Sequence, residues 1–586
     1  MRKVILCLLL AAAALSTAWA ASPLDTVAER SGFKRTGHYD EVIALCAKFA
    51  EGYPDAVRCE EFGRTPQNRP MLAMIVSRSG VLDAAGAQAR KLPVLLVQGG
   101  IHAGEIDGKD AGFLALREAL EGRAAAGALD RLVVVFVPVF NVDGHERFKA
   151  WNRPNQRGPE EMGWRTTAQN YNLNRDYLKA DAPEMRAMLS LMDRWDPLVL
   201  ADLHVTDGAQ FEHGISVMVE PLNSGDAQLR KAGLKLRTSL IDKLARQGAL
   251  PLPFYPSFVV YDDPASGFAD GVAPPRFSHG YMPLRNRFGV LVETHSWKPY
   301  AERVRYTRDT IYDLLEVFAR HGSEWRQQAL AADQRTLGGQ PVALSYKASD
   351  KARLIEFRGY AYTRTPSEIS GRLMTRYDES KPQIWKIPLR DDVQPDRVVT
   401  APSGGYVVPA AHAAWVAARL RTQGVEFHAI ERARPAAAVE TFRAAKVTFD
   451  TQSFEAHQRL DLEGEWQAEA RDIDPRSLFV PIAQPRARLA IALFEPQAPD
   501  SFAAWGEFNN AFEQKEYMEP YVAEAVAREM LANDPTVAAA FNRRLAEDPE
   551  FAGDAMSRLE FFARRHASWD DRYNLYPVLR SAVTLD

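Results

Sequence analysis

Short apolar runs alternate with longer amphipathic segments between residues 70 and 320. The runs have the length of strands, and they are MLAMIV, LPVLLV, LVVVFVPVF, PLVLADLHV and FGVLVE. In the segments between them apolar residues recur at helical spacing, as in PEMRAMLSLMDRW and RDTIYDLLEVF. This alternation predicts an α/β fold in which helices flank a mixed, largely parallel central sheet.

The pattern changes near residue 330. From 331 to 500 short β-like runs such as ALSYKA, GGYVVP and KVTFD are separated by turn residues, which predicts a β-rich domain. From 501 to 586 helical spacing returns, as in AWGEFNNAFEQKEYMEPYVAEAVAREML and RLEFFARRH. We therefore expect an α/β domain over residues 21–330, a β-rich domain over 331–500 and a helical C-terminal segment over 501–586.

The first twenty residues are typical of a secretory signal peptide. Arg2 and Lys3 precede a short apolar run that ends in Ala18, Trp19 and Ala20, which predicts cleavage after Ala20. A membrane anchor is the alternative, but the run is short and no later stretch approaches the roughly 20 apolar residues that a bilayer requires. We expect a periplasmic or secreted protein with no membrane span after cleavage.

Cysteine content and charge exclude two classes of function. Cys46 and Cys59 remain after cleavage, and they could form one disulfide or stay as two buried thiols. No CxxC is present, so disulfide exchange is not expected. Loss of Arg2 and Lys3 with the signal changes the formal charge from −4 to −6, and no long basic block exists. Nucleic acid is therefore not an expected partner.

One histidine and glutamate pair stands directly after a predicted strand. In VLLVQGGIHAGE a glycine turn separates the strand from His102 and Glu105. The spacing alone is weak evidence, because three other pairs share it. They are His38/Glu41, His321/Glu324 and His428/Glu431.

Two further candidates also lie at strand ends. His204 ends the run PLVLADLHV, and Glu293 ends FGVLVE. Functional groups gather at the carboxyl ends of strands in open α/β sheets, so we expect both to meet His102 and Glu105. Two histidines and one glutamate satisfy the three protein ligands of a catalytic zinc site. A second carboxylate, Glu293, could then act as general base.

Other hydrolase signatures are absent. No HExxH motif occurs, which excludes the usual helical zinc protease signature. No GxSxG elbow occurs, so a serine hydrolase has little support.

The motifs GGIHAGE, FNVDG, YNLNRDY, ADLHVT and VLVETHSW together resemble the zinc carboxypeptidase family of the carboxypeptidase A type. The resemblance covers residues 40–320, about half of the chain. It implies one Zn²⁺ per chain, held by His102, Glu105 and His204. It also implies that Glu293 is the general base.

The resemblance implies three kinds of substrate contact. Asn174 and Arg175 match the pair that binds the terminal carboxylate, for which a bidentate guanidinium is well suited. Arg153 in AWNRPN matches, with one residue of displacement, an arginine that follows a tryptophan and stabilises the carbonyl oxygen in the transition state. The mobile tyrosine of the family could be Tyr255, Tyr261 or Tyr281, and Tyr281 is our candidate.

Two positions depart from the family pattern. Gly104 stands where an arginine often precedes the ligand glutamate. Asn172 stands where an aspartate usually orients a zinc-bound histidine, and an amide oxygen can accept the imidazole proton without adding charge. Asp202 lies two residues before His204, on the same strand face, so we expect it to orient that histidine.

The expected function is that of an exported zinc metallocarboxypeptidase. It would hydrolyse the peptide bond next to a free C-terminal carboxylate, with water bound by zinc and Glu293 as general base. One alternative keeps the fold and metal but makes the enzyme an amidase, a deacylase or a cell-wall peptide peptidase. Another alternative is a metal-free binding module with a decayed site.

Overall fold

The strands predicted between residues 70 and 320 form one mixed eight-stranded sheet. Its order is β1-β2-β4-β3-β5-β9-β6-β7, and β3 pairs in parallel with both β4 and β5, while β5 pairs in parallel with β9. Antiparallel pairing is confined to β1 with β2, β2 with β4, and β6 with β9. The strands are β1 (Val57–Arg64), β2 (Pro70–Val76), β3 (Val94–Gly99), β4 (Val133–Val137), β5 (Val199–Thr206), β6 (Ile215–Glu220), β7 (Pro251–Leu252) and β9 (Phe288–His295).

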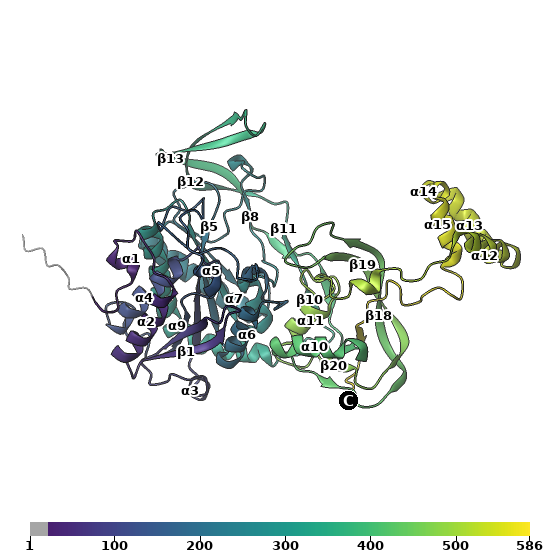
Figure 1. Cartoon of the computed structure of the whole chain (residues 1–586), viewed down its shortest axis with the longest axis horizontal. Helices are drawn as coiled ribbons and strands as arrows, with labels where there is room; N and C mark the ends of the chain where they lie inside the picture. Colours follow the sequence, from purple (N-terminus) through teal and green to yellow (C-terminus); the bar gives the residue numbers. More distant parts are fainter. Residues whose placement is uncertain (1–21) are drawn as a thin grey trace, which may run out of the picture.

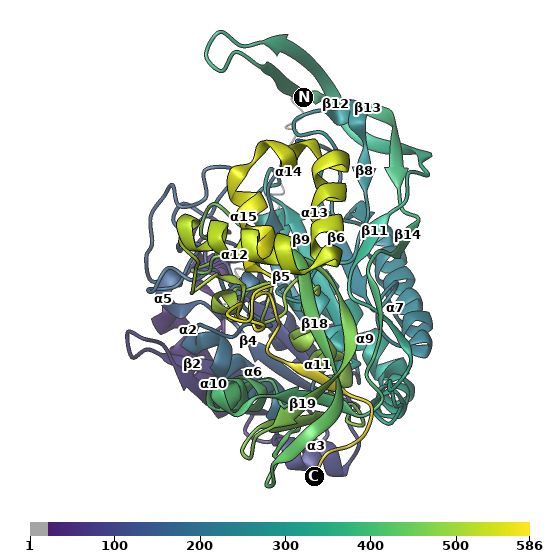
Figure 2. The same ribbon diagram turned by 90° about the vertical axis from the view of Figure 1, so that its right-hand side faces the viewer.

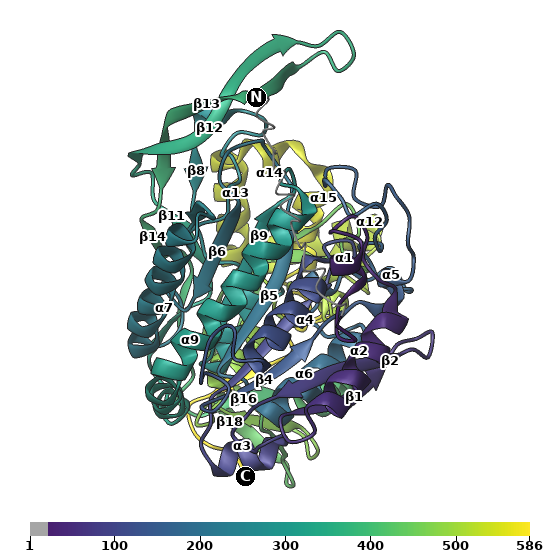
Figure 3. The same cartoon turned by 90° about the vertical axis from the view of Figure 1, so that its left-hand side faces the viewer.

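This computed structural model describes residues 22–586, so the predicted signal peptide lies outside the described residues. Helices flank the sheet, and Figure 3 shows α4 and α9 across the face nearest the viewer. The helices of this part are α1 (Val27–Arg30), α2 (Tyr39–Gly52), α3 (Ala84–Ala89), α4 (Asp107–Leu120), α5 (Val142–His145), α6 (Pro183–Trp195), α7 (Ala227–Arg246), α8 (Ser278–Tyr281) and α9 (Tyr300–Asp333). The predicted α/β fold class is confirmed.

Local sequence explains where the predicted helix α6 begins and ends. Pro183 is its first residue, where a fixed φ suits the first helical turn and no N–H donor is lost. Met185, Met188 and Met192 are fully buried, as their helical spacing predicts. Asp196 ends the helix in the left-handed conformation, with φ of 41°. The next residues enter β5, which carries His204.

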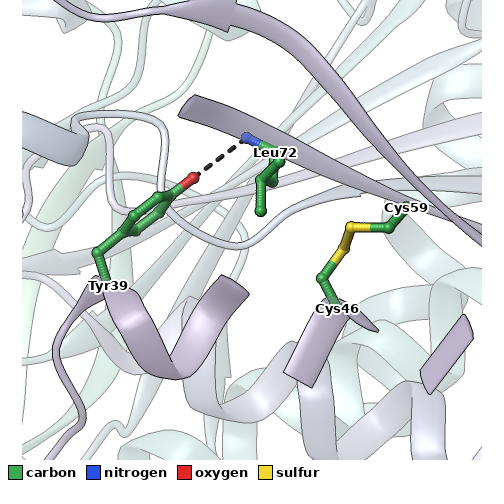
Figure 4. Close-up of a disulfide and its surroundings, with 4 residues drawn as sticks. All are labelled: Tyr39, Cys46, Cys59 and Leu72. Carbon is green, nitrogen blue, oxygen red and sulfur yellow. Dashed lines mark hydrogen bonds between the residues drawn. A yellow bond between two sulfur atoms is a disulfide. The ribbon is translucent and has the colours of Figure 1, made fainter. Parts of the chain in front are cut away.

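A disulfide joins Cys46 of α2 to Cys59 of β1 (Figure 4), with 5.7 Å between the Cα atoms. The Tyr39 hydroxyl ties the same helix to β2, because it accepts the Leu72 N–H at 3.1 Å. Helix α2 is therefore fixed to the edge of the sheet by one disulfide and one hydrogen bond.

Replacing Cys46 by Ala is expected to lower the free energy of unfolding by about 2–4 kcal/mol. A disulfide that closes a loop of this length removes conformational freedom mainly from the unfolded chain. Chemical denaturation of the oxidised wild type and the variant measures the difference. Reduced wild type is the control and should match the variant. Equal stability of the oxidised and reduced wild type would contradict this prediction.

The second unit is an antiparallel six-stranded sheet with the order β17-β20-β16-β21-β18-β19. Its strands are β16 (Gly405–Val408), β17 (His428–Ala429), β18 (Arg434–Phe449), β19 (Leu460–Ile473), β20 (Leu478–Pro481) and β21 (Leu579–Ser581). Two helices that the sequence did not predict belong to it, α10 (Ala410–Thr422) and α11 (Ala487–Phe494). β21 also departs from expectation, since it lies in the segment predicted to be helical.

Two parts stand away from these sheets in Figure 1. One is a long hairpin of β12 (Arg353–Pro366) and β13 (Leu373–Arg390), to which β8 (Phe268–Ala269) adds a short strand. Aromatic residues that include Phe211, Phe357 and Trp385 fix its base. The other is the helical cluster α12 (Pro520–Asn533), α13 (Pro535–Glu547), α14 (Pro549–Gly553) and α15 (Ala555–Ala563), which faces the viewer in Figure 2.

The two sheet units share one hydrophobic core. Leu173 and Leu178 from the first unit belong to the same buried cluster as Val416 and Leu420 of α10. Between them run two-stranded sheets made of β10 (Pro341–Ala343) with β15 (Val398–Thr400) and β11 (Tyr346–Ala348) with β14 (Val393–Pro395). None of the helices within residues 22–586 combines the length and apolar composition that crossing a bilayer demands.

Candidate active site

Three potential metal ligands converge at the carboxyl ends of β3 and β5. His102 and Glu105 lie in the loop after β3, and His204 lies in β5, the parallel neighbour of β3. His102 Nδ1 is 3.0 Å from Glu105 Oε1, and His204 Nδ1 is 2.8 Å from Glu105 Oε2. All three side chains are buried, and one donor atom from each lies within 4.8 Å of the others. Two imidazole nitrogens and a carboxylate are a donor set that fits Zn²⁺.

Each histidine has an oxygen behind the ring nitrogen that faces away from Glu105. His102 Nε2 is 3.1 Å from Asn172 Oδ1, and His204 Nε2 is 3.0 Å from Asp202 Oδ2. Such oxygen acceptors fix the tautomer and orientation of metal-binding histidines. Burial lowers the pKa of His102 to about 4, whereas Asp202 raises the pKa of His204 well above its usual range against the effect of burial. A metal ligand must be neutral, so zinc binding would release the proton of His204.

Asp202 is itself held in place. Its Oδ1 accepts a hydrogen bond from Gln98 Nε2 at 2.8 Å, and Gln98 in turn accepts one from the Tyr177 hydroxyl at 3.0 Å. Asp202 therefore lies where the sequence predicted an orienting carboxylate for His204.

Replacing Asp202 by Asn should weaken zinc binding by about 10- to 100-fold, because the imidazole loses a charged acceptor. The zinc dissociation constant, measured by competition with a chromophoric chelator, tests this. Asn keeps the size of the side chain, so folding should be preserved. Unchanged zinc affinity would show that Asp202 does not orient the ligand.

Glu293 stands beside His204 in the sheet. β5 and β9 pair in parallel with His204 opposite Glu293, so the two side chains share one face. Glu293 is 7% exposed, and no hydrogen-bond partner for its Oε2 exists among residues 22–586. Burial raises its pKa to about 8 against the opposing effect of His204, and Glu105 adds to the rise. A carboxyl group in this setting is suited to accept and return a proton.

The ligand set opens into a cavity of about 460 Å³. The predicted residues that line it are His102, Glu105, His204, Glu293, Asn174 and Arg175. It is also lined by Asp207 and Asp270, which follow β5 and β8, by Glu220 at the end of β6 and by Arg237 of α7.

The surroundings of the Arg175 guanidinium favour binding of an anion. No ion pair among residues 22–586 includes Arg175. Its guanidinium donates to the Asn174 carbonyl at 2.8 Å and rests 4.3 Å from the centre of the Phe277 ring. Burial lowers its pKa to about 10, and Arg165 and Arg276 act in the same direction. A half-buried, unpaired guanidinium among other cations favours a negatively charged ligand.

Two arginines approach Glu105. Arg153 Nη1 lies 3.0 Å from Glu105 Oε1, and its Nη2 lies 3.3 Å from Asp207 Oδ1. Arg153 is buried and is not among the residues that line the cavity. Arg165 Nη1 lies 3.5 Å from Glu105 Oε1 and does line it. Arg165 was not predicted from the sequence, although Trp164-Arg165 gives the tryptophan-arginine order without displacement.

The tyrosine candidates differ in position. Tyr281 is fully buried, and its hydroxyl donates to Gln423 Oε1 at 2.6 Å, so it does not reach the cavity. Tyr255 lines the cavity, is 42% exposed, and accepts a hydrogen bond from the Thr206 hydroxyl at 3.0 Å. The difference has a simple reason: Tyr281 belongs to a helix packed on the sheet, whereas Tyr255 follows β7 in a surface loop.

Comparisons with known proteins point to one family. Residues 42–217 match the family described as zinc carboxypeptidase, and this range contains all three candidate ligands. Over 465 residues the chain is 23% identical to carboxypeptidase 2 of Trichophyton rubrum, covering 75% of this chain and 77% of that protein. The resemblance to zinc carboxypeptidases is confirmed, and the family supports a metallopeptidase.

Solved structures with similar folds include two carboxypeptidases. A metallo-carboxypeptidase from Burkholderia cenocepacia has a TM-score of 0.35 and 15% identity, covering 47% of this chain and 68% of that one. Carboxypeptidase A from Helicoverpa armigera also has a TM-score of 0.35 and 15% identity, covering 51% of this chain and 75% of that one.

Proposed function

We propose that the protein is an exported zinc-dependent carboxypeptidase that removes residues from the free carboxyl end of peptides. The observation that carries this proposal is one cavity that holds a zinc-type donor set, a buried carboxyl group and an arginine that has no acidic partner among residues 22–586. The clustering of these donors beside Glu293 favours an enzyme over a metal-free binding module.

Each group of residues has a different role in peptide hydrolysis. Arg175 and Asn174 bind the terminal carboxylate, which positions the last peptide bond near the ligand set. A zinc ion held by His102, Glu105 and His204 would polarise the scissile carbonyl and lower the pKa of water. Glu293 accepts the proton of the attacking water and then donates a proton to the leaving amine.

The developing negative charge on the carbonyl oxygen needs a nearby cation. Arg153 is held by Glu105 and Asp207, whereas Arg165 reaches the cavity. We assign this contact to Arg165, with Arg153 fixing Glu105. Tyr255 replaces Tyr281 as the candidate tyrosine at the substrate, because it lines the cavity and is partly exposed.

Export is supported by two features. The predicted signal peptide addresses the chain to a compartment outside the cytoplasm. The Cys46–Cys59 disulfide fits an oxidising environment there.

Substitution of Arg175 tests the substrate class. For Arg175→Gln, kcat/KM on a peptide with a free C-terminus is expected to fall about 10- to 100-fold, because a charged hydrogen-bonded contact is lost. The same peptide with an amidated C-terminus should lose less than about threefold. Arg175→Lys is the matched control and should retain part of the preference through its charge. Equal losses on both peptides would contradict carboxylate recognition.

A further inference from the structure

The loop that carries the proposed substrate contacts has little regular structure of its own. Residues 171–181, called here the 171–181 loop, contain one short 3-10 turn, Leu173–Arg175. Asn172, Asn174 and Arg175 all belong to it. Asp176 accepts hydrogen bonds from Lys179 and from the Asp181 backbone within the loop, and further contacts come from the C-terminal unit.

Gln423, at the end of α10, forms a buried bridge to this loop. Its Nε2 donates to the backbone carbonyls of Tyr177 and Leu178 at 2.9 and 2.8 Å. Its Oε1 accepts from the Tyr281 hydroxyl at 2.6 Å, and the residue is only 1% exposed. All three contacts would be left unsatisfied if the C-terminal unit moved away, which is costly in a buried setting.

Two charged residues of the C-terminal unit hold the far end of the loop. Arg419 donates to the Ala180 carbonyl at 2.9 Å and to Asp181 Oδ1 at 2.7 Å. His457 Nε2 lies 2.7 Å from Asp181 Oδ2. Both oxygens of one carboxylate are thus bound by residues from a different unit.

His457 belongs to a tight turn between β18 and β19 that reaches the loop. Residues 454–457 close it with two backbone hydrogen bonds of 2.8 and 3.0 Å between Phe454 and His457. Glu455 and Ala456 have φ of 49° and 69°, a strained conformation for residues that are not glycine. Glu455 Oε2 lies 3.4 Å from the backbone nitrogen of Asn172, from which it accepts a hydrogen bond.

We propose that the C-terminal unit is a clamp that positions the substrate-binding loop, and that Gln423, Arg419 and His457 are positioning residues of the active site. The proposal rests on the proposed function, because it assigns Asn174 and Arg175 to the terminal carboxylate. A guanidinium displaced by about 1 Å loses much of its effect on substrate orientation. Holding the loop from both ends therefore tunes recognition of the carboxylate without touching the zinc ligands.

The test compares three variants of the full-length protein. Arg419→Ala combined with His457→Ala removes both contacts that the C-terminal unit makes with Asp181, while Lys179 of the loop itself stays 3.0 Å from Asp181 Oδ2. The buried Gln423 contacts also remain, and His457→Ala alone is a milder variant at a partly exposed position. His457→Gln keeps a donor toward Asp181 and should rescue. Lys446→Ala is the matched control, since Lys446 lies in the same strand pair and its Glu463 ion pair is exposed.

For a peptide with a free C-terminus, we expect the double variant to raise KM about tenfold and to change kcat less than threefold. The single variant should show a smaller rise of the same kind. Zinc content and the rate on the amidated peptide should stay at the wild-type level. Amide hydrogen exchange in residues 171–181 should become faster in both variants and return toward wild type in His457→Gln.

Two results would overturn the clamp. One is unchanged KM with unchanged exchange in the 171–181 loop. The other is a parallel loss of kcat, zinc and thermal stability, which would show a general structural role. Exchange is measured without substrate, so it tests the clamp even if the proposed function fails. A wild-type enzyme that releases no C-terminal residue would refute the proposed function separately.

Discussion

Glu293→Gln is expected to lower kcat on a peptide substrate by roughly 10²- to 10⁴-fold, the usual contribution of a general acid–base group. The amide has nearly the same shape as the carboxyl group but cannot take up the proton of the attacking water. Glu293 shares a face with His204, and its buried Oε2 has no hydrogen-bond partner among residues 22–586, so we propose that it moves that proton. Steady-state kinetics under saturating peptide measures the loss.

The zinc content of Glu293→Gln shows whether the loss of activity comes from a missing general base or from a missing zinc ligand. Glu293 is not one of the three clustered donors, so the variant should retain one zinc per chain, measured by elemental analysis. Loss of zinc together with activity would make Glu293 a ligand instead of a base. Full activity in the variant would remove it from the mechanism.

His204→Ala is expected to abolish both zinc binding and turnover. It removes one of the three proposed zinc ligands, and it leaves the Asp202 carboxylate buried beside a cavity. Added zinc should not restore activity, in contrast to wild type that has been stripped with a chelator and reloaded. Elemental analysis and peptide hydrolysis are measured on the same preparation.

His321→Ala is the matched control for the ligand variant. His321 and Glu324 have the same spacing as His102 and Glu105, but they lie within the long helix α9 and are not part of the clustered donors. The control should keep wild-type zinc and activity. A zinc content that falls in the control as much as in His204→Ala would contradict the assigned ligand set.

The candidate ligands could be predicted because they are tied to strand ends. Apolar runs of strand length place His102, His204 and Glu293 at one edge of a parallel sheet, whatever the rest of the chain does. They meet because β3, β5 and β9 are neighbours that pair in parallel in the sheet. The helices α6 and α9 could also be predicted, since their apolar residues recur at helical spacing.

Residues on loops could not be placed in the same way. Whether Arg153 or Arg165 reaches the cavity depends on how the segment after α5 folds back over the site, and no periodic pattern encodes that path. For the same reason, the sequence does not show whether Tyr255 or Tyr281 reaches the cavity. Their surroundings depend on how β7, α8 and the C-terminal unit pack together.

The C-terminal part shows a different limit. β21 has only three residues, and its place between β16 and β18 depends on long-range pairing across the sheet. The hairpin β12–β13 has many exposed residues, so burial imposes little alternation on it. Likewise, the contacts of Gln423 and His457 with the 171–181 loop join residues more than 240 positions apart.

In the proposed site, two histidines and one glutamate share a zinc ion beside Glu293. The most direct measurement is anomalous diffraction at the zinc absorption edge from crystals of the zinc-loaded protein. We predict one peak per chain about 2.0–2.2 Å from His102 Nδ1, His204 Nδ1 and a Glu105 carboxylate oxygen. No peak there, or a peak bound by other residues, would contradict the account.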